Sequence, residues 1–200
     1  MAAAAGLTGK QIPEQGWRVG RPQKEVIVSR FEDTVTVGVP VRVAYDQWTQ
    51  FEDFPKFMEG VKTVEQIDDQ TLRWTADVAG KTKTWTADIT DQTPDERIAW
   101  KSIEGADSAG AVLFEPAGSN ETRVTLRIEA EPEGAVESAG DALGFLERRV
   151  KGDLERFKEY VEGTGGDGHG WRGEIHGDQV QPDARESSHG PTDDSSRTSS

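Results

Sequence analysis

The sequence predicts a two-layer α+β domain in which one antiparallel sheet wraps around a long C-terminal helix. Three observations lead to this fold class: a leading strand followed by two short helical segments, six further runs of alternating apolar residues joined by turns, and a closing helical stripe. Together they span residues 30–161, which suffices for one well-buried core. We therefore expect seven strands and a single folded domain.

The first part of this region predicts one strand and two helical segments. Phe31, Val35, Val37 and Val39 fall on one parity and Thr34 and Thr36 on the other, which is the period of a half-buried strand. Pro40 ends that strand and suits the first turn of a helix, and apolar residues recur at helical spacing as far as Trp48. A second stripe then contains Pro55, so we expect a bent segment that ends at Gly60.

The remaining strands alternate between apolar and polar residues. They are predicted at residues 61–67, 71–79, 81–90, 97–103, 109–115 and 122–130. Their connections are too short for parallel crossovers, so the sheet is expected to be an antiparallel meander. The closing helix is predicted to end at Gly163 and to carry one apolar stripe facing the sheet. The stripe consists of Leu143, Leu146, Val150, Leu154, Phe157 and Val161.

The two ends of the chain have a different composition. Residues 1–26 show no hydrophobic period and are interrupted by glycine and proline, which predicts a flexible arm before a domain at residues 27–163. Residues 164–200 are acidic and rich in glycine and serine, which predicts a disordered tail. Within this tail, Trp171 and Ile175 indicate either a docking segment for an unknown protein partner or a stray aromatic residue.

Composition excludes several classes of function. A formal net charge of -14 disfavours nucleic acid as a partner. There is no apolar run long enough for stable membrane insertion, which leaves only transient membrane contact, and no secretory signal is recognisable, so we expect a cytoplasmic protein. The chain lacks cysteine, and its three histidines all lie beyond residue 163 at spacings that fit no compact metal pair. We expect neither a metal nor a cofactor.

Several motifs resemble one known family. They are Val39-Pro40-Val41, Tyr45-Asp46-Gln47-Trp48, Phe54-Pro55-Lys56-Phe57, Trp74-Thr75-Ala76, Pro94-Asp95-Glu96-Arg97, Gly110-Ala111-Val112 and Gly152-Asp153-Leu154. This pattern resembles the polyketide cyclase/dehydrase branch of the START-like (SRPBCC, Bet v 1-like) superfamily, close to its coenzyme Q-binding members. The resemblance implies a helix-grip fold, with a seven-stranded sheet around the C-terminal helix and a hydrophobic cavity between them. It carries over no catalytic residue.

Strand parity suggests which side chains would line such a cavity. The candidates on the sheet are Trp74, Ala76, Val78, Trp85, Ala87, Ile98 and Trp100, together with Ile89 on the same face. The candidates on the helix are Leu143, Leu146 and Val150. A further apolar cluster either fills one end of the sheet as core or forms the mouth of the cavity. It consists of Phe51, Phe54, Phe57 and Met58.

The sequence favours binding of a hydrophobic small molecule, such as a lipid, a quinone or a polyketide-like compound, without catalysis. The alternative is an aromatase/cyclase or dehydratase that acts on an aromatic polyketide. This would require a general acid or base at the cavity, and no dyad of defined spacing identifies one, since charged helix residues such as Asp141, Arg148 and Arg149 are usually solvated. A third hypothesis is a protein-interaction module that uses the segment around Trp171.

Overall fold

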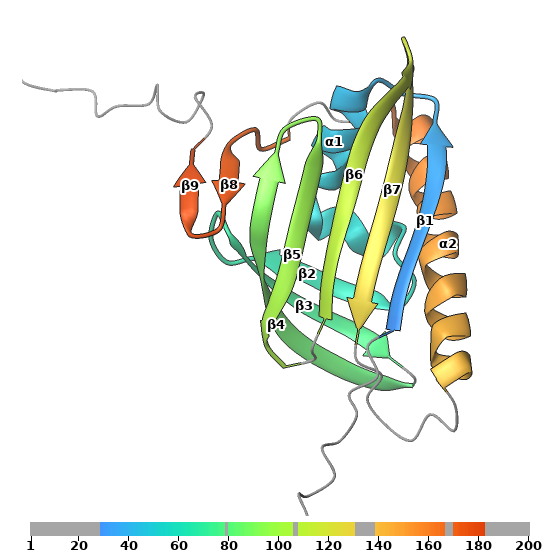
Figure 1. Ribbon diagram of the computed structural model, residues 1–200, viewed down its shortest axis with the longest axis vertical. Helices are drawn as coiled ribbons and strands as arrows, with labels where there is room; N and C mark the ends of the chain where they lie inside the picture. Colours follow the sequence, from blue (N-terminus) through green and yellow to red (C-terminus); the bar gives the residue numbers. More distant parts are fainter. Residues whose placement is uncertain (1–28, 79, 106–107, 131–138, 167–169, 183–200) are drawn as a thin grey trace, which may run out of the picture.

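The computed structural model describes residues 29–78, 80–105, 108–130, 139–166 and 170–182. Their central feature is a strongly curved antiparallel sheet with helices on its concave face (Figure 1). The sheet contains the seven predicted strands and two more near the C-terminus. The strands are β1 (Ser29–Val37), β2 (Val61–Gln66), β3 (Thr71–Val78), β4 (Lys81–Thr93), β5 (Arg97–Glu104), β6 (Ser108–Gly118), β7 (Glu121–Ala130), β8 (Glu174–His176) and β9 (Gln179–Gln181).

The main sheet has the order β1-β7-β6-β5-β4-β3-β2, so β2 to β7 form the predicted meander and β1 joins the far side of β7. β1 pairs with β7 along its whole length, from Ser29 opposite Ala130 to Val37 opposite Thr122. Residues that alternate along each strand reach the concave face, where Val35, Val37 and Val124 are buried. The predicted α+β helix-grip fold is confirmed.

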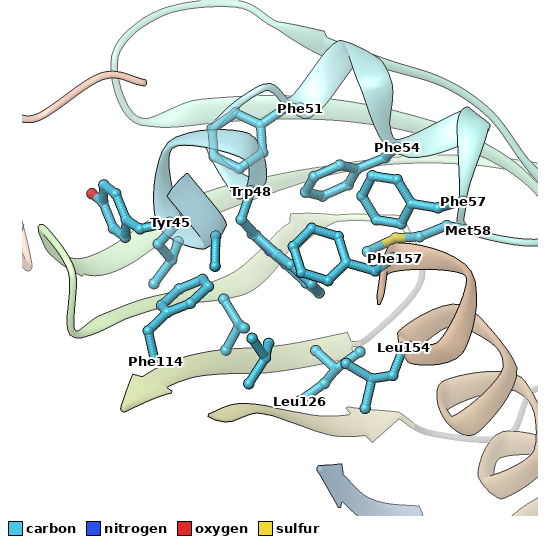
Figure 2. Close-up of a cluster of buried hydrophobic side chains, with 14 of the residues drawn as sticks. Tyr45, Trp48, Phe51, Phe54, Phe57, Met58, Phe114, Leu126, Leu154 and Phe157 are labelled. Carbon is cyan, nitrogen blue, oxygen red and sulfur yellow. The ribbon is translucent and has the colours of Figure 1, made fainter. Parts of the chain in front are cut away.

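Two short helices fill one end of the concave face. α1 (Val41–Trp48) begins directly after Pro40, and η1 (Phe51–Lys56) is a 3₁₀ helix that contains Pro55. The apolar faces of these helices place Trp48, Phe54 and Phe57 in the core, each 1% exposed. Figure 2 shows Trp48 surrounded by phenylalanine rings from η1, β6 and α2. This end of the sheet is closed by aromatic packing.

The long helix α2 (Ala139–Thr164) packs along β1 and closes the second layer. Its predicted stripe is buried where the structure describes the side chains: Val150, Leu154, Phe157 and Val161 are at most 2% exposed. The helix ends at Thr164 rather than at Gly163. Gly165 has a φ of 71° and its N–H donates to the Val161 carbonyl at 3.0 Å, so Gly165 supplies the left-handed residue that terminates the helix.

The C-terminal segment differs from the sequence-based expectation. We predicted disorder from residue 164 onward, but residues 170–182 form a hairpin whose strand β8 pairs with β4 beside Asp91 and Gln92 (Figure 1). β4 continues beyond the last residue that β3 covers, and β8 occupies the sheet edge that this leaves. Ile175 is fully buried there. The prediction of disorder is therefore wrong for residues 170–182, while residues 1–28 and 183–200 lie outside the described part.

A buried ionic cluster fastens this hairpin to α1. The Arg172 guanidinium donates to Asp46 at 2.7 Å and to Asp95 at 2.6 Å, and it lies over the ring of Tyr45. Asp46 is 2% exposed and Tyr45 is fully buried, and burial raises the pKa of the Tyr45 hydroxyl, which accepts a hydrogen bond from Gln92. The segment around Trp171 thus docks on its own domain.

Within the described residues, the structure contains no helix that combines the length and the apolar character required to cross a membrane.

Candidate functional site

The register of the sheet brings the predicted tryptophans together beside the closed aromatic core, where the ring centroid of Trp74 lies 5.5 Å from that of Phe54. Trp74 on β3 lies directly across from Trp85 on β4. Their indole rings are stacked, with centroids 5.8 Å apart and planes inclined by 8°. Both point to the concave face, because Trp74 and Trp85 share the parity of the buried Leu72 and Ala87. The pair forms one wall of a hollow.

Trp100 forms the neighbouring wall, and a glycine positions it. Trp100 on β5 lies opposite Gly110 on β6, and a Cβ atom added to Gly110 would lie only 2.3 Å from the indole ring. The ring therefore rests directly on the Gly110 backbone. A side chain at position 110 would push the indole into the hollow.

Between these walls and α2 lies a cavity of about 200 Å³. Its surface is largely apolar, with contributions from the sheet, from the turn after η1 and from the first half of α2. The lining residues are Met58, Val61, Trp74, Ala76, Trp85, Trp100, Ser108, Ala109, Leu126, Ile128, Phe145, Arg149, Val150 and Asp153. Phe145 is 45% exposed, so the cavity meets the molecular surface beside its ring.

The structure brings together several of the candidate lining residues. Trp74, Ala76, Trp85, Trp100 and Val150 line the cavity. Three other candidates, Ala87, Ile89 and Ile98, are at most 1% exposed on the same face of the sheet but belong to the core beside the cavity. The remaining three, Val78, Leu143 and Leu146, lie in β3 and α2, and their side chains are outside the described part.

The four candidates for a cavity mouth divide between the two ends of the domain. Phe51, Phe54 and Phe57 are at most 4% exposed and pack against one another or against Trp48 (Figure 2). They fill the closed end as core, the first of the two interpretations given above. Met58 alone among the four lines the cavity. The exposed aromatic ring at the rim belongs to Phe145 on α2.

A polar patch interrupts the apolar lining on the side of α2. The Arg149 guanidinium is held by two backbone carbonyls, donating to Asp77 at 3.3 Å and also to Glu59. Asp153, one helical turn further along, is 8% exposed; its Oδ1 accepts from the Glu59 N–H at 2.9 Å and from Arg156. Burial raises the pKa of the Asp153 carboxyl, and the hydrogen bonds from Glu59 and Arg156 oppose this shift.

Sequence reasoning missed this polar patch and part of the apolar lining. Arg149 and Asp153 are four residues apart and flank the apolar stripe at Val150, so their spacing already placed them at the edge of the buried face. Leu126 and Ile128 share the inward parity of Val124 on β7. The pattern around Arg149 and Asp153 was misleading because mixed charge on a helix is usually solvated.

Comparison with known proteins identifies relatives over the same region. Residues 37–159 match the family described as polyketide cyclase/dehydrase and lipid transport. An uncharacterized 17.2 kDa protein of Streptomyces lincolnensis is 46% identical over 149 residues, which is 74% of this chain and 99% of that protein.

Solved structures share the fold. A protein of Deinococcus radiodurans is 31% identical, with a TM-score of 0.55 over 69% of this chain and 98% of that chain. The ZhuI aromatase/cyclase of Streptomyces sp. R1128 is 20% identical, with a TM-score of 0.55 over 69% of this chain and 93% of that chain. At that identity, the likeness to the aromatase/cyclase shows the fold alone.

Proposed function

The chain belongs to the polyketide cyclase/dehydrase and lipid transport family, and on that premise we propose that it binds a compact, hydrophobic, ring-containing small molecule without transforming it. The family was predicted from the sequence motifs and is confirmed, and it associates the fold with hydrophobic ligands or polyketide-related chemistry. The choice of a ring-containing ligand rests on the cavity. Its walls are the indoles of Trp74, Trp85 and Trp100, which offer flat apolar surfaces.

The size of the cavity supports a compact ligand. An apolar cavity of about 150 Å³ is large enough to hold benzene, whereas sites for drug-sized molecules are typically about 300–1,000 Å³. The value of about 200 Å³ observed here lies between these cases and suits one or two fused rings. A quinone head group or the first ring of a polyketide fits that description better than a long acyl chain does.

The test is native mass spectrometry of the protein purified from its own host without detergent, followed by denaturing extraction. A bound molecule at one equivalent that is released on denaturation and contains one or two rings would support the proposal. If the protein is empty, it should still bind naphthalene or 1,4-naphthoquinone in solution, with quenching of tryptophan fluorescence. An empty protein that binds neither probe would contradict the proposal.

Asp153 supports a second candidate function, ring closure or dehydration of a polyketide chain. Its carboxyl lies in the cavity wall, and burial raises its pKa, as a general acid requires. Against this, both of its described hydrogen bonds tie Oδ1 to the protein, which suits a structural role. Turnover of a poly-β-ketone substrate that is lost in Asp153→Asn, with naphthalene binding retained, would favour catalysis; absence of turnover in the unmodified protein would exclude it for that substrate.

A further inference from the structure

Arg149 is the cavity residue whose surroundings say most about the ligand. It extends from α2 across the cavity wall to the turn between η1 and β2, where it donates to the carbonyl of Glu59, and to the end of β3, where it donates to the carbonyl of Asp77. Gly60 in this turn has a φ of 74°, and a Cβ added there would lie 2.9 Å from Nη2. The guanidinium is thus packed against backbone and held in one position, so its remaining N–H groups have a fixed direction.

The positive charge of Arg149 is only partly compensated by its neighbours: it acts to lower the pKa of the nearby Asp153 carboxyl, which also lines the cavity. Backbone carbonyls accept hydrogen bonds but carry no net charge, and within the described ranges Arg149 forms no ion pair with a carboxylate. The nearby Asp153 is paired with Arg156 instead. Glu59 also faces Arg156, at 3.5 Å, and its side chain is 74% exposed, so solvent screens it. Within the described residues, the otherwise largely apolar cavity wall therefore carries a cation that forms no direct ion pair, beside the carboxyl of Asp153.

Arg149 also retains hydrogen-bonding capacity. A guanidinium has five N–H donors arranged in a planar fork, and the two backbone carbonyls use one donor on Nη1 and one on Nη2. The remaining donors have no described partner in the protein. In surroundings of low polarity, a charged donor of this kind interacts strongly with an anionic oxygen.

We propose that the ligand of this cavity is a hydrophobic organic acid, with its apolar ring against Trp74, Trp85 and Trp100 and its carboxylate on Arg149. This inference rests on the proposed function, because it requires that the cavity binds a ring-containing molecule. It adds the chemical class of the ligand and the residue that selects it. An uncharged molecule of the same shape would leave the cation of Arg149 without a partner inside the complex.

The inference can be tested with two probes of equal size. Naphthalene-2-carboxylate and 2-acetylnaphthalene share the same ring system and the same number of heavy atoms, but only the first is an anion. Their dissociation constants are measured by calorimetry on the full chain, for the unmodified protein and for Arg149→Met. Arg148→Met is the matched control, because Arg148 is the neighbouring exposed arginine on the same helix.

We expect the unmodified protein and Arg148→Met to bind the carboxylate about tenfold more tightly than the ketone, as a charge-assisted hydrogen bond predicts. Arg149→Met should lose this preference and keep its affinity for the ketone, while Arg149→Lys should keep part of the preference. Equal binding of both probes to the unmodified protein would overturn the inference and leave the proposed function intact. Failure to bind either probe would overturn both. The preference in the unmodified protein decides the matter even if a variant does not fold.

Discussion

The two ends of the space between the sheet and α2 use aromatic side chains in opposite ways. At the closed end, Trp48 contacts the rings of Phe54 and Phe157 with centroids 5.7 and 4.7 Å away and planes inclined by 68° and 69°. At the cavity end, Trp74 stacks on Trp85 and also contacts Phe54 of the closed end, with ring centroids 5.5 Å apart. Trp74, Trp85 and Trp100 all line the empty space of the cavity. Aromatic residues therefore mark a core in one place and a binding site in the other.

The difference arises from what lies between the layers. α1 and η1 enter between the sheet and the C-terminal half of α2, and they bring Trp48, Phe54 and Phe57 into that gap (Figures 1 and 2). No described element occupies the corresponding gap beside the N-terminal half of α2. The lesson is that an inserted helix, rather than residue type, decides whether aromatic side chains fill the space or surround it.

Replacing one tryptophan at each end should give the largest difference in stability between the two ends. Trp48→Ala removes a side chain that is 1% exposed and should lower the free energy of unfolding by about 3–5 kcal/mol. Trp100→Ala should lower it by about 1–2 kcal/mol, because Trp100 is only partly buried and already faces a void. Urea denaturation measures both. Equal losses would mean that the cavity end is packed as tightly as the closed end.

The ionic cluster of the C-terminal hairpin should behave as part of the closed end. Arg172→Met leaves the buried carboxylate of Asp46 without its principal partner and should lower the free energy of unfolding by about 3 kcal/mol. Arg42→Met is the matched control: Arg42 also faces Asp46, at 3.6 Å, but it is 54% exposed, so we expect less than about 0.5 kcal/mol. A loss in Arg172→Met no larger than in Arg42→Met would show that the hairpin contributes little to stability.

Filling the cavity should separate binding from stability. Gly110→Ala places a Cβ within 2.3 Å of the present position of Trp100, and the cavity that Trp100 lines gives the indole room to move aside. We expect an unfolding free energy lowered by about 1 kcal/mol and at least tenfold weaker binding of naphthalene-2-carboxylate. The control is Gly163→Ala, since a Cβ there meets nothing within 4 Å. Unchanged binding in Gly110→Ala would show that the ligand occupies another place.

The smallest effect is a dependence on pH. Because burial raises the pKa of Asp153, the native state holds this proton over a range of pH in which the unfolded chain has lost it. Stability should therefore fall as pH rises from the ordinary carboxyl pKa to the raised one. The difference in unfolding free energy between the unmodified protein and Asp153→Asn, measured from about pH 4 to pH 7, should decrease with rising pH.

Asp77 is the control, because its pKa is shifted in the opposite direction to that of Asp153. A hydrogen bond from Thr82 and the neighbouring Lys62 lower the pKa of Asp77, so its contribution to stability is present above the ordinary carboxyl pKa and disappears as pH falls. The difference between the unmodified protein and Asp77→Asn should accordingly increase with rising pH. If the two differences change in the same direction, the assignment to Asp153 is wrong.

The fold was predictable because local patterns and tertiary structure agree. The alternation through Trp74 and Trp85 and the stripe through Val150 and Phe157 each identified the buried face. The hairpin at residues 170–182 was not predictable in the same way. Its strands have only three residues each and are separated by Gly177 and Asp178, and their stability depends on a free edge of β4 that exists only in the folded sheet.

The candidate site was predictable only in part, for a different reason. Parity identified Trp74, Trp85 and Trp100 as inward-facing, but it gives a direction and not the distance to the opposite layer. Phe54 and Phe57 have equally inward-facing side chains, yet they lie in solid core. The role of Arg149 was not predictable, because its position depends on the turn at Gly60. There the backbone carbonyl of Glu59 holds the guanidinium beside the cavity.

The hairpin lies outside the region that the family model matches, yet it is part of the folded unit. The match to the family model stops at residue 159, within α2, whereas Arg172 and Ile175 complete the burial of Asp46 and the edge of β4. A chain cut at residue 159 would leave the buried Asp46 without Arg172 and would open the edge of β4, and an open strand edge promotes association between copies. The segment that the family model matches is thus shorter than the segment that completes this fold.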